Sequence, residues 1–370
     1  MGALPASTGL SYGGRAQPEH AARAVSRALK RARLSQAGAV LLFLTPHYAQ
    51  NPDPAIRAAA RAGGCLQVIG GTAAGILTEE EWVLDSPGAA AMVFADPITL
   101  APAAAAAATD DDAVLLSLCT PAGLTADWLD IPAHRVGAIS GDLFGHGPFK
   151  VWSNSRVADS GRADARFRGV RGAIGASQGV RALTSPIEVA EVHGYDIKRL
   201  GNYPALNVLV KSLPAGIRDM ERIPLHLIMG GVTFGDPMTA IRDGRYRLNH
   251  IVSANLRDQS ITLSHPLSRG ERLFWAMRDA LTAERDMRNT IEQAAATLRA
   301  LPSFALLFPC MGRGPHFYGN RDRDLDALAR RFPRLPIIGM YGNGELGPLD
   351  GANHLYQYST VLGLFSTRTS

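Results

Sequence analysis

The chain has 370 residues, of which 46% are hydrophobic and 19% are charged, and it carries a net charge of +5. This balance is typical of a globular protein with two or three domains and excludes a disordered chain. The densest basic run, 23–33, has no aromatic residues interleaved with it, so we interpret it as a solvated helix face and expect no nucleic-acid partner.

The N-terminal part alternates predicted helices with buried strands. Residues 1–16 are rich in small residues and we expect them to be frayed. A helix follows at 18–34, and the continuous apolar run 39–44 is typical of a strand buried on both faces. A short helix after Asn51 ends at the glycines 63–64, and a second buried strand enters Gly70 and Gly71. Further strands are predicted at 89–95, 113–119 and 135–140.

The remainder changes character and then returns to the first pattern. Residues 149–192 alternate and predict an antiparallel meander, followed by a short helix at 203–212. The predicted strands beyond it lie at 225–231, 247–254, 260–264, 304–308, 336–339 and 355–365, and the predicted helices at 277–300 and 322–331. The long helix should end before Pro302.

Residues 68–77 align without gaps to residues 337–346, with Ile, Gly, Gly and Leu in the same places. Each of the two glycine-rich turns follows the same predicted series of elements, which is a helix, an apolar strand, a short helix and a second apolar strand. We therefore predict a mixed α/β fold with two similar lobes, over 17–220 and 221–366. Its sheets should be buried with helices on the outer faces, as a layered sandwich.

Four segments together resemble the FIST family, the F-box and intracellular signal transduction proteins. They are 68–75, 178–181 with 194–206, 308–314 with 317–319, and 336–348 with 353–356. The resemblance implies a FIST N-terminal domain at 17–220 and a FIST C-terminal domain at 221–366. Val180 stands where family members often have Cys, and Ala182 where they often have Pro, while Arg181 is kept.

The FIST resemblance implies a sensory module for small ligands such as amino acids, with a protein signalling partner and no established reaction. Glycines on both sides of Arg313 allow a ligand to approach the backbone, and a guanidinium is a good receptor for carboxylates. The alternative is a turn whose Arg313 pairs with a structural acid, and a solvated Glu345. The predicted ligand-binding residues are Arg313, Gly312, Gly314, Cys310, Glu345, Asn343, Gly342, Gly70, Gly71, Thr72 and Arg181.

The three cysteines, Cys65, Cys119 and Cys310, are odd in number and far apart, which favours a reducing, cytoplasmic location and no disulfide framework. A thiol-dependent transferase or hydrolase centred on Cys310 is the alternative function, with His316 and His354 as candidate bases. No cysteine-hydrolase signature surrounds Cys310, and a small buried residue is the simpler interpretation.

No cofactor or metal site is predicted. The glycine spacing is not that of a dinucleotide fingerprint. The run 110–112 of three aspartates lacks the spacing of a calcium loop and is interpreted as a solvated acidic loop. We read no signal peptide and no stretch long enough to span a bilayer, so we expect no membrane association.

Overall fold

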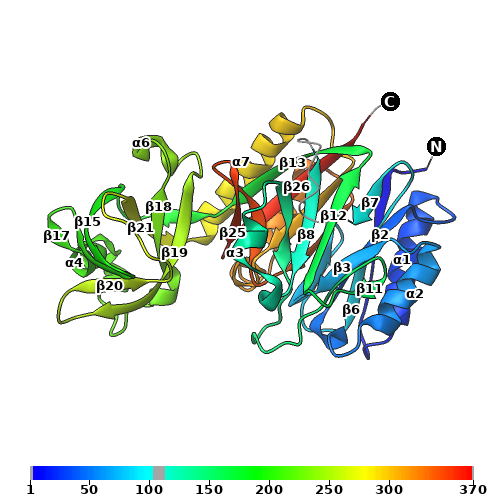
Figure 1. The fold of residues 1–370 in the computed structure, drawn as a ribbon, viewed down its shortest axis with the longest axis horizontal. Helices are drawn as coiled ribbons and strands as arrows, with labels where there is room; N and C mark the ends of the chain where they lie inside the picture. The colour runs from blue at the N-terminus through cyan, green and yellow to red at the C-terminus, as the bar shows by residue number, and fades with distance from the viewer. Residues whose placement is uncertain (1–2, 103–112, 369–370) are drawn as a thin grey trace. The chain divides into compact units, whose positions relative to one another are not determined.

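The computed structural model describes residues 3–102 and 113–368, so the acidic run 110–112 lies outside the described residues. The chain forms two compact units (Figure 1). The first contains Met1–Ser177 and Asp286–Ser370, and the second contains Gln178–Arg285. The second unit is therefore an insertion in the sequence of the first. The predicted boundary at 220 falls inside this insertion, so the two predicted domains do not coincide with the two units.

The first unit is built from three repeats of one element order. The first repeat contains β1 (Ala6–Tyr12), α1 (Glu19–Ala32), β2 (Ala39–Leu44), η1 (Pro46–Tyr48), α2 (Asp53–Gly63), β3 (Val68–Thr72), β4 (Gly75–Thr78), β5 (Trp82–Val83) and β6 (Gly88–Phe94). The second contains β7 (Thr99–Pro102), β8 (Val114–Cys119), η2 (Pro121–Gly123), α3 (Ala126–Leu129), β9 (His134–Ile139), β10 (Val151–Ser153), β11 (Arg156–Val157) and β12 (Arg162–Arg168). The third contains β13 (Val170–Ser177), α7 (Ala280–Leu298), β22 (Phe304–Pro309), η4 (Met311–Arg313), α8 (Arg323–Arg331), β23 (Ile337–Tyr341), β24 (Glu345–Leu349), β25 (Ala352–Tyr356) and β26 (Thr360–Thr367).

Each repeat supplies four strands to one six-stranded sheet and a hairpin to another. The strand orders are β1-β6-β2-β3-β10-β11, β7-β12-β8-β9-β24-β25 and β13-β26-β22-β23-β4-β5. In every sheet the third and fourth strands are parallel and all other neighbours are antiparallel. The hairpins β4–β5, β10–β11 and β24–β25 are thus exchanged cyclically among the three sheets.

A glycine at the same place in each parallel strand pair confirms that the repeats are equivalent. A Cβ added to Gly70, Gly137 or Gly339 would lie 1.7 Å from the carbonyl oxygen of the strand partner. Because that distance excludes any side chain, all three positions require glycine. The predicted alignment of 68–77 with 337–346 is therefore confirmed in space, and a third copy exists that the alignment did not include.

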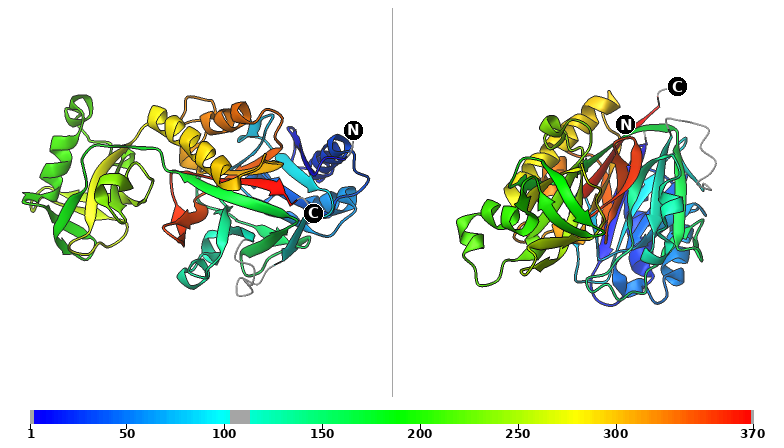
Figure 2. Two further views of the ribbon diagram at one scale, coloured as in Figure 1. Left: turned by 90° about the horizontal axis from the view of Figure 1, so that it is seen from above. Right: turned by 60° about the vertical axis from the view of Figure 1, so that its left-hand side comes forward.

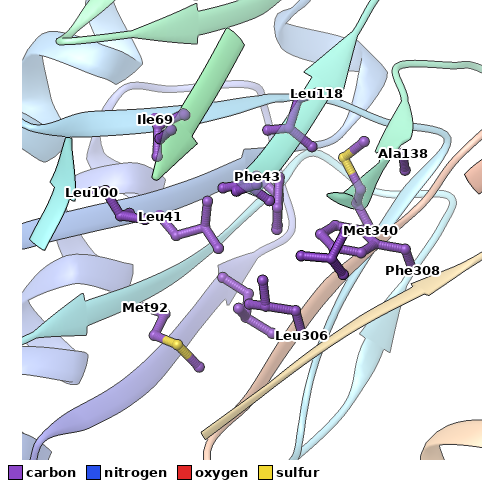
Figure 3. Packing of buried hydrophobic residues seen from close by; sticks show 14 of the residues in the cluster. Leu41, Phe43, Ile69, Met92, Leu100, Leu118, Ala138, Leu306, Phe308 and Met340 are labelled. Carbon is purple, nitrogen blue, oxygen red and sulfur yellow. The ribbon is translucent and has the colours of Figure 1, made fainter. Parts of the chain in front are cut away.

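The three sheets share one hydrophobic core. Leu41, Phe43, Leu118, Leu306 and Phe308 all lie in it (Figure 3). Helices α1 and α2 cover the outer face of the first sheet. Helices α7 and α8, yellow and orange in Figure 2, cover the sheet that contains β26. The prediction of a mixed α/β fold with buried sheets and outer helices is confirmed.

The expectation of a frayed N-terminus is wrong for 6–12, which form the edge strand β1. Its small residues have a packing reason. A Cβ on Gly9 would lie 2.1 Å from the carbonyl oxygen of Ala24, because α1 crosses directly over this strand. Small residues are expected both in a frayed terminus and in a strand that a helix crosses closely. The sequence alone does not distinguish these two cases, and the contact with α1 does.

The second unit is a closed ring of six antiparallel strands around its own core. Strands β21, β15, β16, β20, β19 and β18 pair in that order, and β18 pairs again with β21. Its elements are β14 (Val180–Ala182), β15 (Ile187–His193), β16 (Asp196–Leu200), β17 (Tyr203–Pro204), α4 (Ala205–Ser212), α5 (Ala215–Arg218), η3 (Leu225–Leu227), β18 (Ile228–Thr233), α6 (Pro237–Ala240), β19 (Tyr246–Asn255), β20 (Ser260–Leu263) and β21 (Arg272–Arg278). Across the described residues, no helix is long and apolar enough to cross a membrane.

Candidate functional site

Two predicted turns of the third repeat lie against each other at the ends of β22 and β23. Cys310 forms a bridge with Gly342. The backbone N–H of Met311 donates to the carbonyl of Gly342 at 2.9 Å, and the N–H of Gly342 donates to the carbonyl of Pro309 at 3.1 Å. The predicted residues Cys310, Gly312, Arg313, Gly342 and Glu345 therefore belong to one structural site.

Glu345 is the most unusual residue of this site. Its side chain is fully buried, and neither carboxylate oxygen has a hydrogen-bond partner among the described residues. The Cys310 thiol and the backbone N–H of Ser359 lie close to it without forming a hydrogen bond of good geometry. Burial raises the pKa of Glu345 well above its usual value, although these two groups and the charge of Arg313 act in the opposite direction. Burial therefore favours the neutral, protonated form of Glu345, whose donor and acceptor capacity is unused.

The Cys310 thiol is also held in its neutral form. Burial, and then the charge of Glu345, raise the pKa of Cys310 far above that of an ordinary thiol, while the backbone N–H groups of Gly312 and Tyr358 lower it. No histidine is among the described groups that shift this pKa. Because the thiolate is the nucleophile, the environment of Cys310 does not favour thiol catalysis.

Arg313 is almost completely buried and is already paired inside the protein. Its Nε donates to Asp324 Oδ2 at 2.9 Å, and its Nη2 donates to Asp324 Oδ1 at 3.1 Å. Its terminal nitrogens also donate to the carbonyl and the hydroxyl of Ser177, each at 2.7 Å. Burial alone would lower the pKa of Arg313, but the charge of Asp324 raises it above its usual value.

This pairing corresponds to the alternative interpretation of Arg313, a partner of a structural acid. The same Asp324 accepts hydrogen bonds from Tyr318 at 2.8 Å and Thr360 at 2.7 Å. A direct bond from Arg313 to a ligand carboxylate would require breaking this buried network. Arg313 instead acts on Glu345 through its positive charge.

A third buried acid, Asp322, was not expected from the sequence. It accepts a hydrogen bond from the backbone N–H of Leu325 at 2.9 Å, which caps α8, and another from the hydroxyl of Tyr341. Burial and the charge of Asp324 raise the pKa of Asp322 to about 6. The position of Asp322 at the start of the helix predicted over 322–331 was a capping signal that could have identified it.

The remaining predicted residues of the third repeat, Gly312, Gly314 and Asn343, pack closely against neighbouring groups. A Cβ on Gly312 would lie 2.4 Å from the ring of Tyr358, so this ring rests directly on the turn. Tyr358 has a φ of 55°, a left-handed conformation that is costly for an aromatic residue. Gly314 lies against the ring of Tyr341, and the side chain of Asn343 packs on Gly141.

The predicted residues outside the third repeat have different surroundings. Gly70 and Gly71 are strand residues of β3, and the Thr72 hydroxyl lies 3.1 Å from that of Ser140. The turn after β3 adjoins the site, because the N–H of Ala74 donates to the carbonyl of Tyr341 at 3.1 Å. Arg181 is exposed on β14 in the second unit and is not assigned to this site.

The first and second repeats have positions equivalent to those of the site, and the residues there can be compared with it. The backbone N–H groups of Thr45, Thr120 and Cys310 each donate to a carbonyl at the start of the last strand of their repeat, at 3.1, 2.8 and 2.8 Å. The acceptors are Gly88, which begins β6, and Gly161 and Ser359, which directly precede β12 and β26. The three donor residues also precede the 3-10 turns, so they occupy equivalent places. The thiol of Cys310 therefore stands where the other repeats have a threonine hydroxyl.

The same comparison for Glu345 gives apolar residues. In the strand pairs that the hairpins form, Glu345 lies opposite Ala138, Ile76 opposite Met340, and Val151 opposite Gly71. Ala138, Met340 and Gly71 each directly follow one of the three glycines that the parallel strands require, Gly137, Gly339 and Gly70. Ile76 and Val151 are thus the counterparts of Glu345, and both are buried. The scaffold places an apolar side chain here twice, so an acid at this position is not a requirement of the fold.

No group of three or more His, Cys, Asp or Glu side chains within the described ranges is arranged to hold a metal ion. The carboxyl group of Glu345 can form hydrogen bonds or, once it has lost its proton, an ion pair, and the thiol of Cys310 can form a weak hydrogen bond. Tyr358, whose ring rests on Gly312, and Asn343, two residues before Glu345, are both half-buried.

Residues 205–348 match the sequence model of the FIST C domain. The chain is 29% identical over 238 residues to an uncharacterized protein of Mycobacterium bovis, covering 64% of this chain and 61% of that protein. It is 27% identical over 249 residues to an uncharacterized protein of Mycobacterium tuberculosis, covering 66% and 65%. The chain thus spans less than two thirds of these relatives. A 70-residue segment is 34% identical to F-box only protein 22 of Homo sapiens, covering 19% of this chain and 17% of that protein.

Proposed function

We propose that this chain, which carries a FIST C domain, is a sensory protein that binds a small ligand at Glu345 and reports its presence to a protein partner. The observation that carries the proposal is the state of Glu345, a fully buried acid without a hydrogen-bond partner at a position that two sister repeats fill with Ile76 and Val151. A buried polar group left without a partner costs about 1–3 kcal/mol. A cost that the fold does not require is expected where a side chain serves function.

The chemistry of Glu345 favours a ligand with an ammonium group. An ammonium group within hydrogen-bond distance would stabilise the carboxylate, so that the acid loses its proton on binding and forms an ion pair. The half-buried amide of Asn343, two residues away, offers a donor for the carboxylate of the same ligand. A free amino acid, or another small molecule that carries both groups, meets these two requirements.

The position of Glu345 also provides a route for the signal. Glu345 begins β24, which belongs to the third repeat by sequence but pairs with β9 of the second. A new ion pair at Glu345 would act on this exchanged hairpin and on the turn that contains Cys310. The response of a sensor requires that ligand binding favours one of two arrangements of such an element.

A thermal-shift screen of amino acids and small organic acids tests the proposal with the wild type and Glu345→Gln. A ligand at a hundred times its Kd stabilises the folded state by about 2.7 kcal/mol. At least one amine-bearing compound should raise the Tm of the wild type and leave that of Glu345→Gln unchanged, because an amide cannot become a carboxylate. A compound that stabilises both proteins equally would place its site elsewhere and contradict the proposal.

A further inference from the structure

A groove separate from Glu345 lies between α2 of the first repeat and the hairpin β10–β11 of the second. Figure 1 shows α2 next to β11. Its volume is about 910 Å³, which is within the range of small-molecule sites. The lining residues are Arg57, Ala60, Arg61, Leu66, Ser153, Asn154, Ser155 and Arg156. The groove contains three arginines and no acidic residue.

The three arginines are free to take a ligand. Arg57 and Arg61 are four residues apart and therefore lie on the same face of α2, and Arg156 begins β11 on the facing hairpin. No guanidinium of the three has a hydrogen-bond or ion-pair partner among the residues that the structure describes, and all three are exposed. Arg31 shows the ordinary alternative, since it pairs with Glu80 at 2.6 Å.

The hairpin that faces α2 is fixed in place. The hydroxyl of Ser155 donates to the carbonyl of Leu66 at 2.9 Å, and its backbone N–H donates to the carbonyl of Val68 at 3.0 Å. Asn154 and Ser155 have φ values of 48° and 61°, and a serine in this left-handed region carries a conformational cost. The side chains of Arg156 and Asn154 are therefore presented from a rigid turn.

The equivalent hairpins of the other repeats have the opposite charge. The turn of β4–β5 contains Glu79, Glu80 and Glu81, and the turn of β24–β25 contains Asp350. Glu79 is already engaged within the protein, since its carboxylate accepts a hydrogen bond from the backbone N–H of Ile337 at 3.0 Å. The positive groove is thus a property of this one place and not of the repeated scaffold.

We propose that the groove of Arg57, Arg61 and Arg156 binds a small molecule with a diphosphate group. The planar guanidinium fork matches phosphate oxygens with two parallel hydrogen bonds, and Ser153 and Asn154 add neutral donors. Ala60 and the exposed Leu66 offer apolar surface to the rest of such a molecule. The site is independent of Glu345 and gives the protein a second ligand class.

Calorimetric titration of the full chain with inorganic pyrophosphate, ADP and inorganic phosphate tests this proposal. Both diphosphates should bind saturably and more tightly than phosphate. A tighter affinity for ADP than for pyrophosphate assigns the apolar surface to the ligand body, and equal affinities assign all binding to the diphosphate. Either outcome supports the site.

The variant Arg57→Gln/Arg61→Gln/Arg156→Gln should bind both diphosphates at least a hundredfold more weakly, because each charge-assisted contact contributes about a tenfold factor or more. The control Arg15→Gln/Arg168→Gln/Arg171→Gln removes the same charge from exposed positions elsewhere in the first unit and should bind like the wild type. Absence of saturable binding, or equal weakening in both variants, overturns the proposal. Tighter binding of a DNA duplex than of ADP, lost in the groove variant alone, overturns it in favour of a nucleic-acid surface. The single variant Arg57→Gln serves if the triple variant does not fold.

Discussion

The carboxyl group of Glu345 lies beside the thiol of Cys310, and both are buried at places where the first repeat has Ile76 and Thr45. Two residues that differ from their counterparts on the repeated scaffold thus lie side by side, an acid in place of an apolar residue and a thiol in place of a hydroxyl. Because the sister repeats serve as internal controls, the substitutions that test this pair can be taken from the protein itself.

Replacing Glu345 with isoleucine should stabilise the protein. The change removes a buried polar group that has no partner and introduces the side chain that the first repeat has at this place. We expect a gain of about 1–3 kcal/mol in the free energy of unfolding, measured with urea. The reverse change, Ile76→Glu, should destabilise by a similar amount or more. A large loss of stability in Glu345→Ile would mean that the acid is structural.

Arg313→Ala should destabilise the protein by about 3–5 kcal/mol, because it leaves the buried carboxylate of Asp324 without its cation. Arg313→Lys should recover only part of this loss, since an ammonium cannot reproduce the forked pair. Urea denaturation measures both variants. If Arg313→Ala kept the wild-type stability and lost only ligand binding, Arg313 would be a direct ligand receptor.

The Cys310 thiol should react slowly with iodoacetamide in the folded protein at pH 8. Burial and the neighbouring Glu345 raise its pKa, so the reactive thiolate is scarce. Mass spectrometry after timed alkylation, compared with the protein unfolded in urea, measures the protection. Rapid alkylation of Cys310 in the folded state would favour the thiol-dependent enzyme, and Cys310→Thr would then abolish a measurable turnover.

Buried acids should make the stability fall as the pH rises from about 4 to about 6. The pKa of Asp322 is raised to about 6, above its value in the unfolded chain, so the folded state binds more protons in this range and is favoured at its lower end. Urea denaturation across this range should show a weaker dependence in Asp322→Asn than in the wild type. An identical pH dependence in the two proteins would show that Asp322 is not protonated in the folded state.

The sequence identified the turns and strands of the site because local signals mark them. Gly70 and Gly339 follow short apolar runs, and the sequence around them aligns without gaps. The copy around Gly137 was missed because its turn is replaced by a loop, 140–150, and its neighbouring strands share little with the other two. The insertion of a whole unit between β13 and α7 further hid the third repeat, and led to a predicted boundary at 220.

The chemistry of the site could be predicted less well than its position. The glycines around Arg313 led to the prediction that a ligand approaches the backbone there, and they did not indicate that Ser177, 136 residues away, would accept two of its hydrogen bonds. The inserted second unit separates this partner from Arg313 in the sequence, so no local signal marks the contact. A local signal is also absent for Glu345, whose burial depends on the hairpin β24–β25 joining the sheet of another repeat.

Calorimetric titration of the amine-bearing ligand found by the thermal-shift screen tests the account most directly, with the wild type, Glu345→Ile and Cys310→Thr side by side. The wild type and Cys310→Thr should bind with similar Kd values, because threonine occupies the place of Cys310 in both sister repeats. Glu345→Ile should be at least as stable as the wild type and show no binding. Binding of the ligand to Glu345→Ile with the wild-type Kd would contradict the assignment of the sensory site to Glu345.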